Sequence, residues 1–337
     1  MFGRISSVAF AAVLVSSCAA SSAEEISESA QDTGGLSSDL AALVAQPQTG
    51  SINPDATKDA EFFRNTPERF KPFVAVCNPW DEWDKPAPAF QIHGNTYHVG
   101  TCGISAILIT GEQGHILIDG GTEAGADIIA ANIASLGFEI GDVEYILHSH
   151  EHFDHAAGIA HLQRLSGARL IASPRAKLVL ESGVVADDDP QAGMHDPFPA
   201  ATVFQTIEDG EAVELSAIRA TAIFTPGHSP GAISWQWRSC EGESCYWMVY
   251  ADSLSPVSSD AYRFSDHPEY LAAYEAGLER LGRTQCDILL TPHPSHSRMI
   301  RRMRTDAMIQ PAACAYYAMD KVRDIEARLE REAGGDQ

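Results

Sequence analysis

The sequence is short of positive charge. Its 337 residues include 23 Lys and Arg against 46 Asp and Glu, which gives a formal net charge of −23. An acidic surface repels nucleic acids and anionic lipids, so neither is expected as the main partner. Hydrophobic residues make up 45% and charged residues 20%, as in a globular protein with a sizeable core. We find no internal repeat.

The sequence also lacks a hydrophobic run long enough to cross a membrane comfortably. The N-terminal run, residues 5–15, follows a single arginine and precedes two serines and Cys18. This order is typical of a secretory signal, so we expect residues 1–17 to direct export and to be removed. Residues 15–18 resemble a lipobox, which would place a lipid on Cys18; ordinary cleavage a few residues later is the alternative.

No Cys-x-x-Cys motif occurs, which argues against a cysteine metal site. The seven cysteines are an odd number, but Cys18 is lipidated or removed under either interpretation of the N-terminus. The remaining six suit disulfides in an oxidising compartment. Cys240 and Cys245 flank a glycine-containing turn between two predicted strands, so a hairpin disulfide is geometrically natural. The pairing of the other four stays open at this point: Cys77, Cys102, Cys286 and Cys314.

The hydrophobic pattern changes along the chain. Residues 18–72 have no sustained periodicity beyond a short helix near 36–44, and we expect a flexible acidic lead there, followed by a catalytic domain over 73–337. In that domain strands and helices mix, which predicts an α/β or α+β fold. We expect strands at 104–110, 115–119, 143–149, 169–173, 218–225, 232–238, 245–251 and 287–291, and helices at 125–136, 156–165, 174–181, 267–281 and 311–332.

Three histidines and an aspartate crowd into six residues directly after the predicted strand 143–149. Alternate residues of an extended chain point the same way, so His150, His152 and Asp154 can share a face, and His155 follows at the turn into a helix. Imidazole and carboxylate are the ligands that zinc accepts in catalytic sites. The pattern therefore predicts a metal site rather than a polar turn.

Two further histidines follow predicted strands in rigid loops. His228 lies in a Pro-Gly-His-Ser-Pro-Gly stretch and His293 lies between two prolines. Proline and glycine turns fix a side chain without helix packing, and the ends of neighbouring strands converge. We expect both histidines to join the cluster.

These motifs resemble the metallo-β-lactamase superfamily, and within it the subclass B3 β-lactamases. The resemblance runs from about Trp80 to Cys314. The segments that carry it are Val99-Gly100-Thr101, residues 117–121, 150–155, 225–231 and 250–255, and Thr291-Pro292-His293-Pro294. The resemblance implies an αββα sandwich of two mixed β-sheets flanked by helices. It also implies a zinc hydrolase acting on cyclic amides, which opens the β-lactam ring of penicillins, cephalosporins and carbapenems with a metal-bound hydroxide.

The resemblance further implies two zinc ions and assigns their ligands. His150, His152 and His228 would hold the first, and Asp154, His155 and His293 the second. Asp154 would also orient the nucleophile.

Two serines follow the predicted strand 245–251. By resemblance, Ser253 would hydrogen-bond a zinc-bound water as a catalytic residue, and Ser255 would bind the substrate carboxylate. Asp252 is the alternative to Ser253, because neighbouring strand residues face opposite sides and other members of the superfamily place a zinc ligand there. Asp119 would be a buried carboxylate that supports the ligand loop.

The resemblance pairs Cys286 with Cys314 and leaves Cys77 for Cys102. It implies a monomeric periplasmic enzyme for antibiotic resistance, with a small β-lactam as its substrate. A membrane contact would come only through a lipid on Cys18, which would anchor the protein to the outer membrane.

Three readings remain to be distinguished. The first is the β-lactamase, and the second is an exported dizinc hydrolase of another ester, lactone or thioester. The third is a non-catalytic lipoprotein with structural zinc. The loop 186–199 could line the substrate pocket. His296 could line it too, but we expect a surface role for it. The arginine-rich run 298–304 is most simply a solvated face.

Overall fold

The computed structural model describes residues 63–334. The predicted signal, the Cys18 lipid site and the helix near 36–44 lie outside the described residues. Within them, no helix combines the length and the apolar composition that a membrane span needs.

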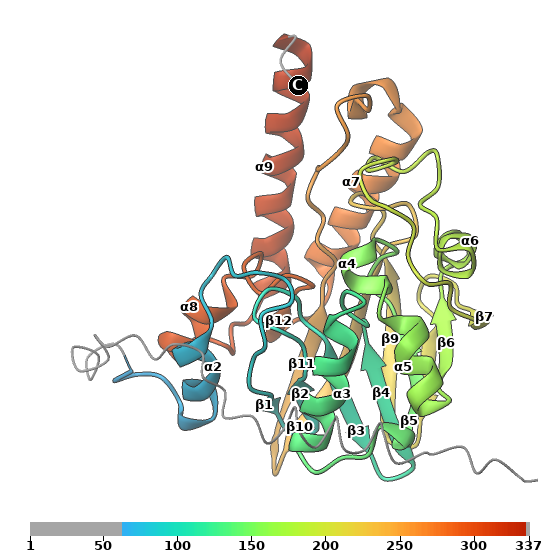
Figure 1. Cartoon of the computed structure of the whole chain (residues 1–337). Coiled ribbons are helices and arrows are strands. Elements are labelled where there is room, and N and C mark those ends of the chain that lie inside the picture. The colour runs from blue at the N-terminus through green and yellow to red at the C-terminus, as the bar shows by residue number, and fades with distance from the viewer. Residues whose placement is uncertain (1–62, 335–337) are drawn as a thin grey trace, which may run out of the picture.

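Two β-sheets form the centre of the fold (Figure 1). The first has seven strands in the order β1-β2-β3-β4-β5-β6-β7, and the second has five in the order β12-β11-β10-β9-β8. The first sheet contains β1 Phe90–His93, β2 Thr96–His98, β3 Ile107–Gly111, β4 Gly114–Ile118, β5 Val143–Leu147, β6 Arg169–Ala172 and β7 Val203–Thr206. The second contains β8 Ala212–Leu215, β9 Ile218–Phe224, β10 Ile233–Glu241, β11 Ser244–Tyr250 and β12 Ile288–Leu290. Both sheets mix parallel and antiparallel pairs, as expected for the αββα sandwich.

Helices cover the outer faces. Figure 1 shows α3 and α5 in front of the first sheet and α9 projecting beyond the sheets. The helices are α2 Lys71–Val76, α3 Gly125–Ser135, α4 Phe153–Ala156, α5 Ile159–Ser166, α6 Pro174–Ser182, α7 Pro268–Arg283, α8 Met299–Arg304 and α9 Ala313–Gly334.

Alternation along the strands explains the layers. In β3, Ile107 and Ile109 face the core between the sheets, where they join Trp235 of β10. Leu108 faces the other way, into the core beneath α3 and α5. A third core packs Tyr274 of α7 and residues of α9 against the second sheet. Trp235 and Trp237 of β10 are fully buried and belong to the core.

The structure differs from the sequence prediction at several elements. β1, β2, β7 and β8 were not predicted, because these strands have three or four residues and give little alternating pattern. The helix predicted at 156–165 begins later, as α5 at Ile159, and a separate short helix, α4, precedes it. The chain breaks at Gly158, where a Cβ atom would lie 2.1 Å from the carbonyl oxygen of Gly120. The inter-sheet core includes Phe70, which precedes the domain start expected at residue 73.

Three disulfides join Cys77 to Cys102, Cys240 to Cys245, and Cys286 to Cys314. They are the three pairs expected above. The second closes the β10–β11 hairpin, where Cys240 and Cys245 are directly opposite each other. The third ties the chain before β12 to the first turn of α9.

Candidate metal centre

The cluster begins where β5 ends. β5 lies between β4 and β6 in the first sheet, and its last residue is Leu147. The chain stays extended to His152, which caps α4, and then turns into that helix. His150 and His152 therefore project from the extended segment, while Asp154 and His155 project from the first helical turn.

His150, His152 and His228 offer one ligand atom each within 4.8 Å of one another. Nδ1 of His152 lies 3.3 Å from Nε2 of His228. Nε2 of His150 is buried and has no hydrogen-bond partner among residues 63–334. Because zinc–nitrogen bonds are about 2.0 Å long, ligand atoms on a tetrahedral zinc lie about 3.3 Å apart. These three side chains fit a metal ion.

The other nitrogen of each histidine is held by an oxygen. Nδ1 of His150 lies 2.8 Å from Oδ1 of Asp252. Nε2 of His152 lies 3.1 Å from both carboxylate oxygens of Asp189. Nδ1 of His228 donates to the carbonyl of Ser255 at 2.9 Å. Such outer partners fix the tautomer and the ring orientation of metal-ligating histidines.

A second group of ligand atoms lies beside the first. Nε2 of His155 and Nε2 of His293 lie 3.1 and 3.2 Å from Oδ2 of Asp154, and 3.3 Å from each other. His150 is also within ligand distance of Asp154 and His155. Nδ1 of His293 donates to the carbonyl of Gly103 at 3.3 Å. The fold thus brings together all six predicted ligands.

The electrostatics suit metal binding. Burial, and then the neighbouring histidines, lower the pKa of His150 and His228 well below the usual range. Burial alone would raise the pKa of Asp154, but His155 and His293 hold it well below the usual range. Neutral imidazole and ionised carboxylate are the forms that bind metals, so these three groups favour metal binding. Against the effect of burial, the Asp189 carboxylate raises the pKa of His152, and the Asp154 carboxylate raises the pKa of His155 to about 10. A metal ion must therefore displace a proton from these two imidazoles.

Asp119 supports the ligand segment from beneath. It is fully buried and accepts hydrogen bonds from the backbone and the hydroxyl of Ser149 at 2.6 and 2.7 Å. Tyr250 donates to it at 2.8 Å. Its φ of 67° lies in the left-handed region, where a residue other than glycine is strained. This network confirms the supporting role expected for Asp119.

The three residues at the exit of β11 occupy different places. Asp252 lies behind His150, so its carboxylate is not among the converging ligand atoms. Ser253 is fully buried, and its hydroxyl has no hydrogen-bond partner among the described residues. Ser255 lines the cavity over the cluster. Tyr274 and Tyr317 hold this segment by donating to the carbonyls of Leu254 and Ser253.

Two buried groups next to the ligands brace the surrounding loops. Glu151 accepts hydrogen bonds from the hydroxyl of Ser229 and from the backbone of Gly231. Burial, and then the Asp189 carboxylate, raise the pKa of Glu151 to about 7. His148 accepts from the backbone of Ser173 at 3.1 Å. Both residues therefore link the β5 exit to neighbouring segments.

The cavity over the cluster has a volume of about 540 Å³, within the range of small-molecule sites. Asp154, His152, His228 and His293 face it, and the loop 186–199 contributes Gln191, Met194 and His195, as expected for a substrate-facing loop. His296 lines it too, with its ring 4.8 Å from that of His293.

One wall of the cavity and one buried carboxylate were not predicted from the sequence. Trp80 and Trp83 line the cavity and are 79% and 39% exposed. The two tryptophans in the polar stretch 78–84 could have indicated this wall, since exposed aromatic residues mark binding sites. Asp189 had no such signal, because only the fold brings it to His152.

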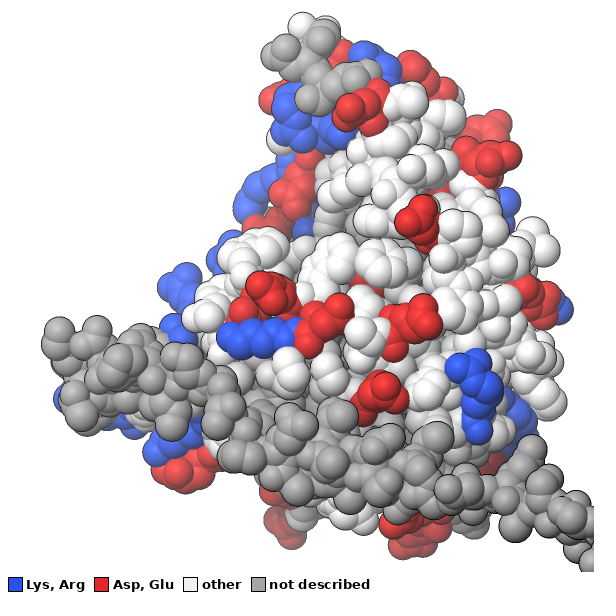
Figure 2. Space-filling view, in the orientation of Figure 1, with Lys and Arg blue, Asp and Glu red and all other residues white. Residues whose placement is uncertain are grey.

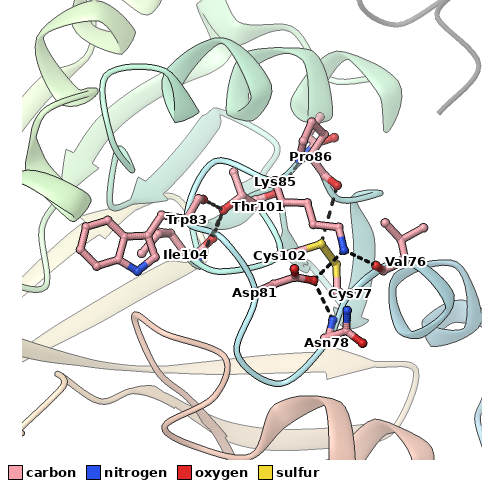
Figure 3. The surroundings of a disulfide bond; sticks show 12 residues. Val76, Cys77, Asn78, Asp81, Trp83, Lys85, Pro86, Thr101, Cys102 and Ile104 are labelled. Carbon is pink, nitrogen blue, oxygen red and sulfur yellow. Dashed lines mark hydrogen bonds and ion pairs between the residues drawn. A yellow bond between two sulfur atoms is a disulfide. The ribbon is translucent and has the colours of Figure 1, made fainter. Parts of the chain in front are cut away.

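The segment that carries both tryptophans is tethered at its base (Figure 3). The Cys77–Cys102 disulfide precedes it, and Asp81 accepts from the backbone of Asn78 and from Lys85 at 2.8 Å each. Lys85 also donates to the carbonyl of Val76. The tether holds the tryptophan wall at the edge of the cavity.

Comparison with known proteins agrees with this geometry. Residues 99–237 match the model of the metallo-beta-lactamase superfamily. The solved structure of MIM-2 metallo-beta-lactamase is 53% identical, with a TM-score of 0.77, and the match covers 79% of this chain and 99% of that one. MIM-1 from Novosphingobium pentaromativorans is 45% identical over 76% of this chain and 94% of that one, with a TM-score of 0.74.

Two further relatives are less similar in sequence. MEM-A1, a subclass B3 metallo-beta-lactamase from a soil metagenome library, is 40% identical over 76% of this chain and all (100%) of that one, with a TM-score of 0.73. The hydroxyacylglutathione hydrolase of Maricaulis maris is 29% identical over 108 residues, and the chain spans only 33% of that relative's length. Given these matches and the six converging ligands, the chain belongs to the metallo-β-lactamase superfamily and resembles its subclass B3 members.

Proposed function

We propose that the protein is a dizinc hydrolase that opens the β-lactam ring of penicillins, cephalosporins and carbapenems. The observation that carries the proposal is the convergence of six ligand side chains at the floor of an open cavity. The identity of 53% with MIM-2 over nearly all of that chain supports the substrate class. Structural zinc sites are closed, whereas catalytic sites keep an open coordination position, so the open cavity favours a catalytic role.

We assign His150, His152 and His228 to one zinc ion and Asp154, His155 and His293 to the other. Bound zinc supplies Lewis acidity and lowers the pKa of a coordinated water from about 16 to about 7. The outer partners of the histidines keep the ligands oriented while substrate binds and leaves.

The remaining roles fall to side chains around the cluster. Asp154 lies at the cavity floor, where its carboxylate can accept a proton and orient the attacking water. The unpartnered hydroxyl of Ser253 is suited to bonding to water at the cluster, and Ser255 on the wall is suited to the substrate carboxylate. Trp80 and Trp83 offer apolar faces for the body of the substrate.

The cellular setting is part of the proposal. Three disulfides suit an oxidising compartment, and we propose that residues 1–17 direct the chain to the periplasm. A lipid on Cys18 would anchor it to the outer membrane. We propose that the enzyme acts as a monomer, because the site is complete within one chain.

A thioesterase is the second candidate. The match to the hydroxyacylglutathione hydrolase favours it, although that match covers 32% of this chain. The position of Asp252 weighs against it, because a zinc-ligating aspartate was the expected mark of the alternative substrates and Asp252 instead lies against Nδ1 of His150.

The test is turnover of nitrocefin and of a carbapenem by the purified protein, before and after treatment with a chelator. We expect hydrolysis that the chelator abolishes and that added zinc restores. Hydrolysis of a glutathione thioester without any lactam turnover by a zinc-loaded sample would establish the second candidate instead.

A further inference from the structure

A second cavity lies between α8 and α9, behind the loop that carries His293. Its volume is about 390 Å³, and its lining includes Arg298, Arg301, Arg302, Gln310 and Tyr316. His296 lines both this cavity and the one over the metal cluster. The two cavities therefore share a wall.

Arg302 corrects the expectation that the arginine-rich run is a solvated face. Its side chain is only 9% exposed. Nε donates to the carbonyl of Ser297 at 2.9 Å, and one terminal nitrogen, Nη2, donates to the carbonyl of Leu289 at 2.6 Å. Nη1 is buried without a hydrogen-bond partner, and no carboxylate of residues 63–334 forms an ion pair with the guanidinium. A buried charge without a counter-ion is costly.

The surroundings of Arg302 add more positive charge. Arg301 is exposed and forms no ion pair within the described part of the chain. The one carboxylate in the lining, Asp320, lies 3.6 Å from Arg298 and 2.8 Å from Arg323, so two guanidinium groups already neutralise it. Figure 2 shows Lys and Arg side chains along the edge where Figure 1 places α8 and α9.

The lining also has a part that suits an organic group. Leu289, Ala307, Ala313, Tyr316 and Tyr317 border the same space. Tyr316 is 58% exposed at its mouth. A cavity of this size exceeds the needs of a bare inorganic ion and falls within the range for small organic ligands.

We propose that this cavity is a binding site for a phosphate-bearing ligand, whose phosphate group meets Arg301 and Arg302 and whose organic body lies against Tyr316. Arginine forks match phosphate oxygens geometrically. A phosphate here supplies the counter-ion that Arg302 lacks. The phosphate can belong to a soluble phosphomonoester or to a phospholipid headgroup, and the experiment separates the two.

A phosphate bound in this cavity affects the loop that carries His293, because hydrogen bonds link Arg302 to that loop. The carbonyl that accepts from Nε belongs to Ser297, whose hydroxyl lies 2.9 Å from that of Thr291. The Thr291 hydroxyl in turn donates to the carbonyl of His293 at 2.7 Å. A phosphate on Arg302 therefore stiffens the loop 291–297, and we expect slower amide hydrogen exchange at 295–297.

The test uses the full chain with phenyl phosphate and inorganic phosphate as probes, at constant ionic strength against chloride. Calorimetry measures the affinity of the wild type, of Arg301→Ala and of the control Arg238→Ala. The control replaces an exposed arginine of β10 that has no ion pair in the described structure. We expect phenyl phosphate to bind the wild type and the β10 variant equally and Arg301→Ala at least tenfold more weakly. Equal binding by all three proteins overturns the proposal, and so does the absence of binding both to phenyl phosphate and to the vesicles of the second arm.

The second arm uses vesicles of phosphatidylcholine with and without phosphatidic acid. Binding that requires phosphatidic acid and is lost in Arg301→Ala assigns the site to a lipid headgroup, and binding of phenyl phosphate alone assigns it to a soluble ligand. Vesicle binding that persists in Arg301→Ala, without phenyl phosphate binding, counts against the cavity. Hydrogen exchange at 295–297 provides a readout that does not depend on catalysis.

Discussion

The floor and the wall of the main cavity are held in different ways. At the floor, His150, His152 and His228 are buried, and each has its outer nitrogen fixed by Asp252, Asp189 or the Ser255 carbonyl. At the wall, the side chains of Trp80 and Trp83 are exposed. Their segment is held by a disulfide and by Lys85 at its base, and by a hydrogen bond from the Thr101 hydroxyl to the Trp83 carbonyl.

The two regions have different tasks in the proposed function: the floor holds the metal ligands, and the wall contacts the substrate. Ligand atoms must keep their positions within fractions of an ångström, so the floor is braced by buried hydrogen bonds from several segments of the chain. A wall that meets substrates of different shapes can be built on an exposed loop. Changes at the floor should therefore affect metal binding, and changes at the wall should affect substrate affinity.

The largest effect is expected from removing a ligand at the floor. In His150→Ala we expect kcat/KM to fall by on the order of 10³-fold or more, because several kcal/mol of transition-state stabilisation depend on the metal. Zinc content by mass spectrometry should fall in parallel. Full zinc content with normal turnover would remove His150 from the ligand set.

The next effect concerns the tether of the wall. Replacing both Cys77 and Cys102 by serine should cost about 2–4 kcal/mol of unfolding free energy and raise KM, while zinc affinity stays the same. The control is the double variant Cys240→Ser and Cys245→Ser. The disulfide that it removes closes a hairpin and has a sequence separation of 5, whereas Cys77 and Cys102 are separated by 25. A loss of zinc affinity in the first variant, measured by chelator competition, would contradict the separation of wall and floor.

A smaller effect is expected from an outer partner at the floor. Asp189→Asn should weaken zinc binding or activity by about 10–100-fold, because His152 loses its charged acceptor. Asp188→Asn is the matched control, since Asp188 is exposed and pairs only with Arg175 in the described structure. Equal zinc affinity for both variants would show that Asp189 does not position His152.

A buried histidine in β2 gives a prediction for the pH dependence of stability. The ring of His98 stacks on Phe90 and meets Phe73 edge-to-face, and burial lowers its pKa to about 3, whereas an unfolded histidine titrates near 6.5. The unfolded chain therefore binds a proton that the folded chain excludes, and stability falls by about 1.4 kcal/mol per pH unit below about 6.5. His98→Phe should remove about 2 kcal/mol of the loss between pH 6.5 and pH 5.

Denaturant titrations of both proteins at the two pH values measure this difference. The ring stays aromatic in the variant, so the change at neutral pH should be small by comparison. Parallel stability curves for the wild type and His98→Phe across the range would show that His98 does not contribute to acid sensitivity.

The smallest effect is expected at the wall itself. Trp83 packs with its ring 5.6 Å from Phe153 and 6.1 Å from His293. Trp83→Ala should raise KM for nitrocefin by a factor of about 3–10, equivalent to about 1 kcal/mol of lost apolar contact, with little change in kcat. A fall in kcat without a change in KM would place Trp83 among the groups that act on the reaction itself.

Much of the centre could be predicted from sequence because its information is local. The segment 150–155 carries four ligands in six residues, and His228 and His293 lie in proline-containing loops that follow predicted strands. The strands β3 and β4 were predicted at 104–110 and 115–119 for the same reason. Short strands such as β1 and β7 were not, since their pattern is too brief to stand out from a loop.

The sequence by itself predicted the six candidate metal ligands and the class of fold, because each depends on residue type and on spacing along the chain. Only the tertiary structure decided that Asp189 stands behind His152 and that Asp252 lies behind His150 rather than among the ligands. It also decided that Arg302 is buried beside the His293 loop. The contacts of Asp189 and Asp252 join segments far apart in sequence, and the burial of Arg302 depends on the packing around it, so all three exist only after the sheets and helices have packed.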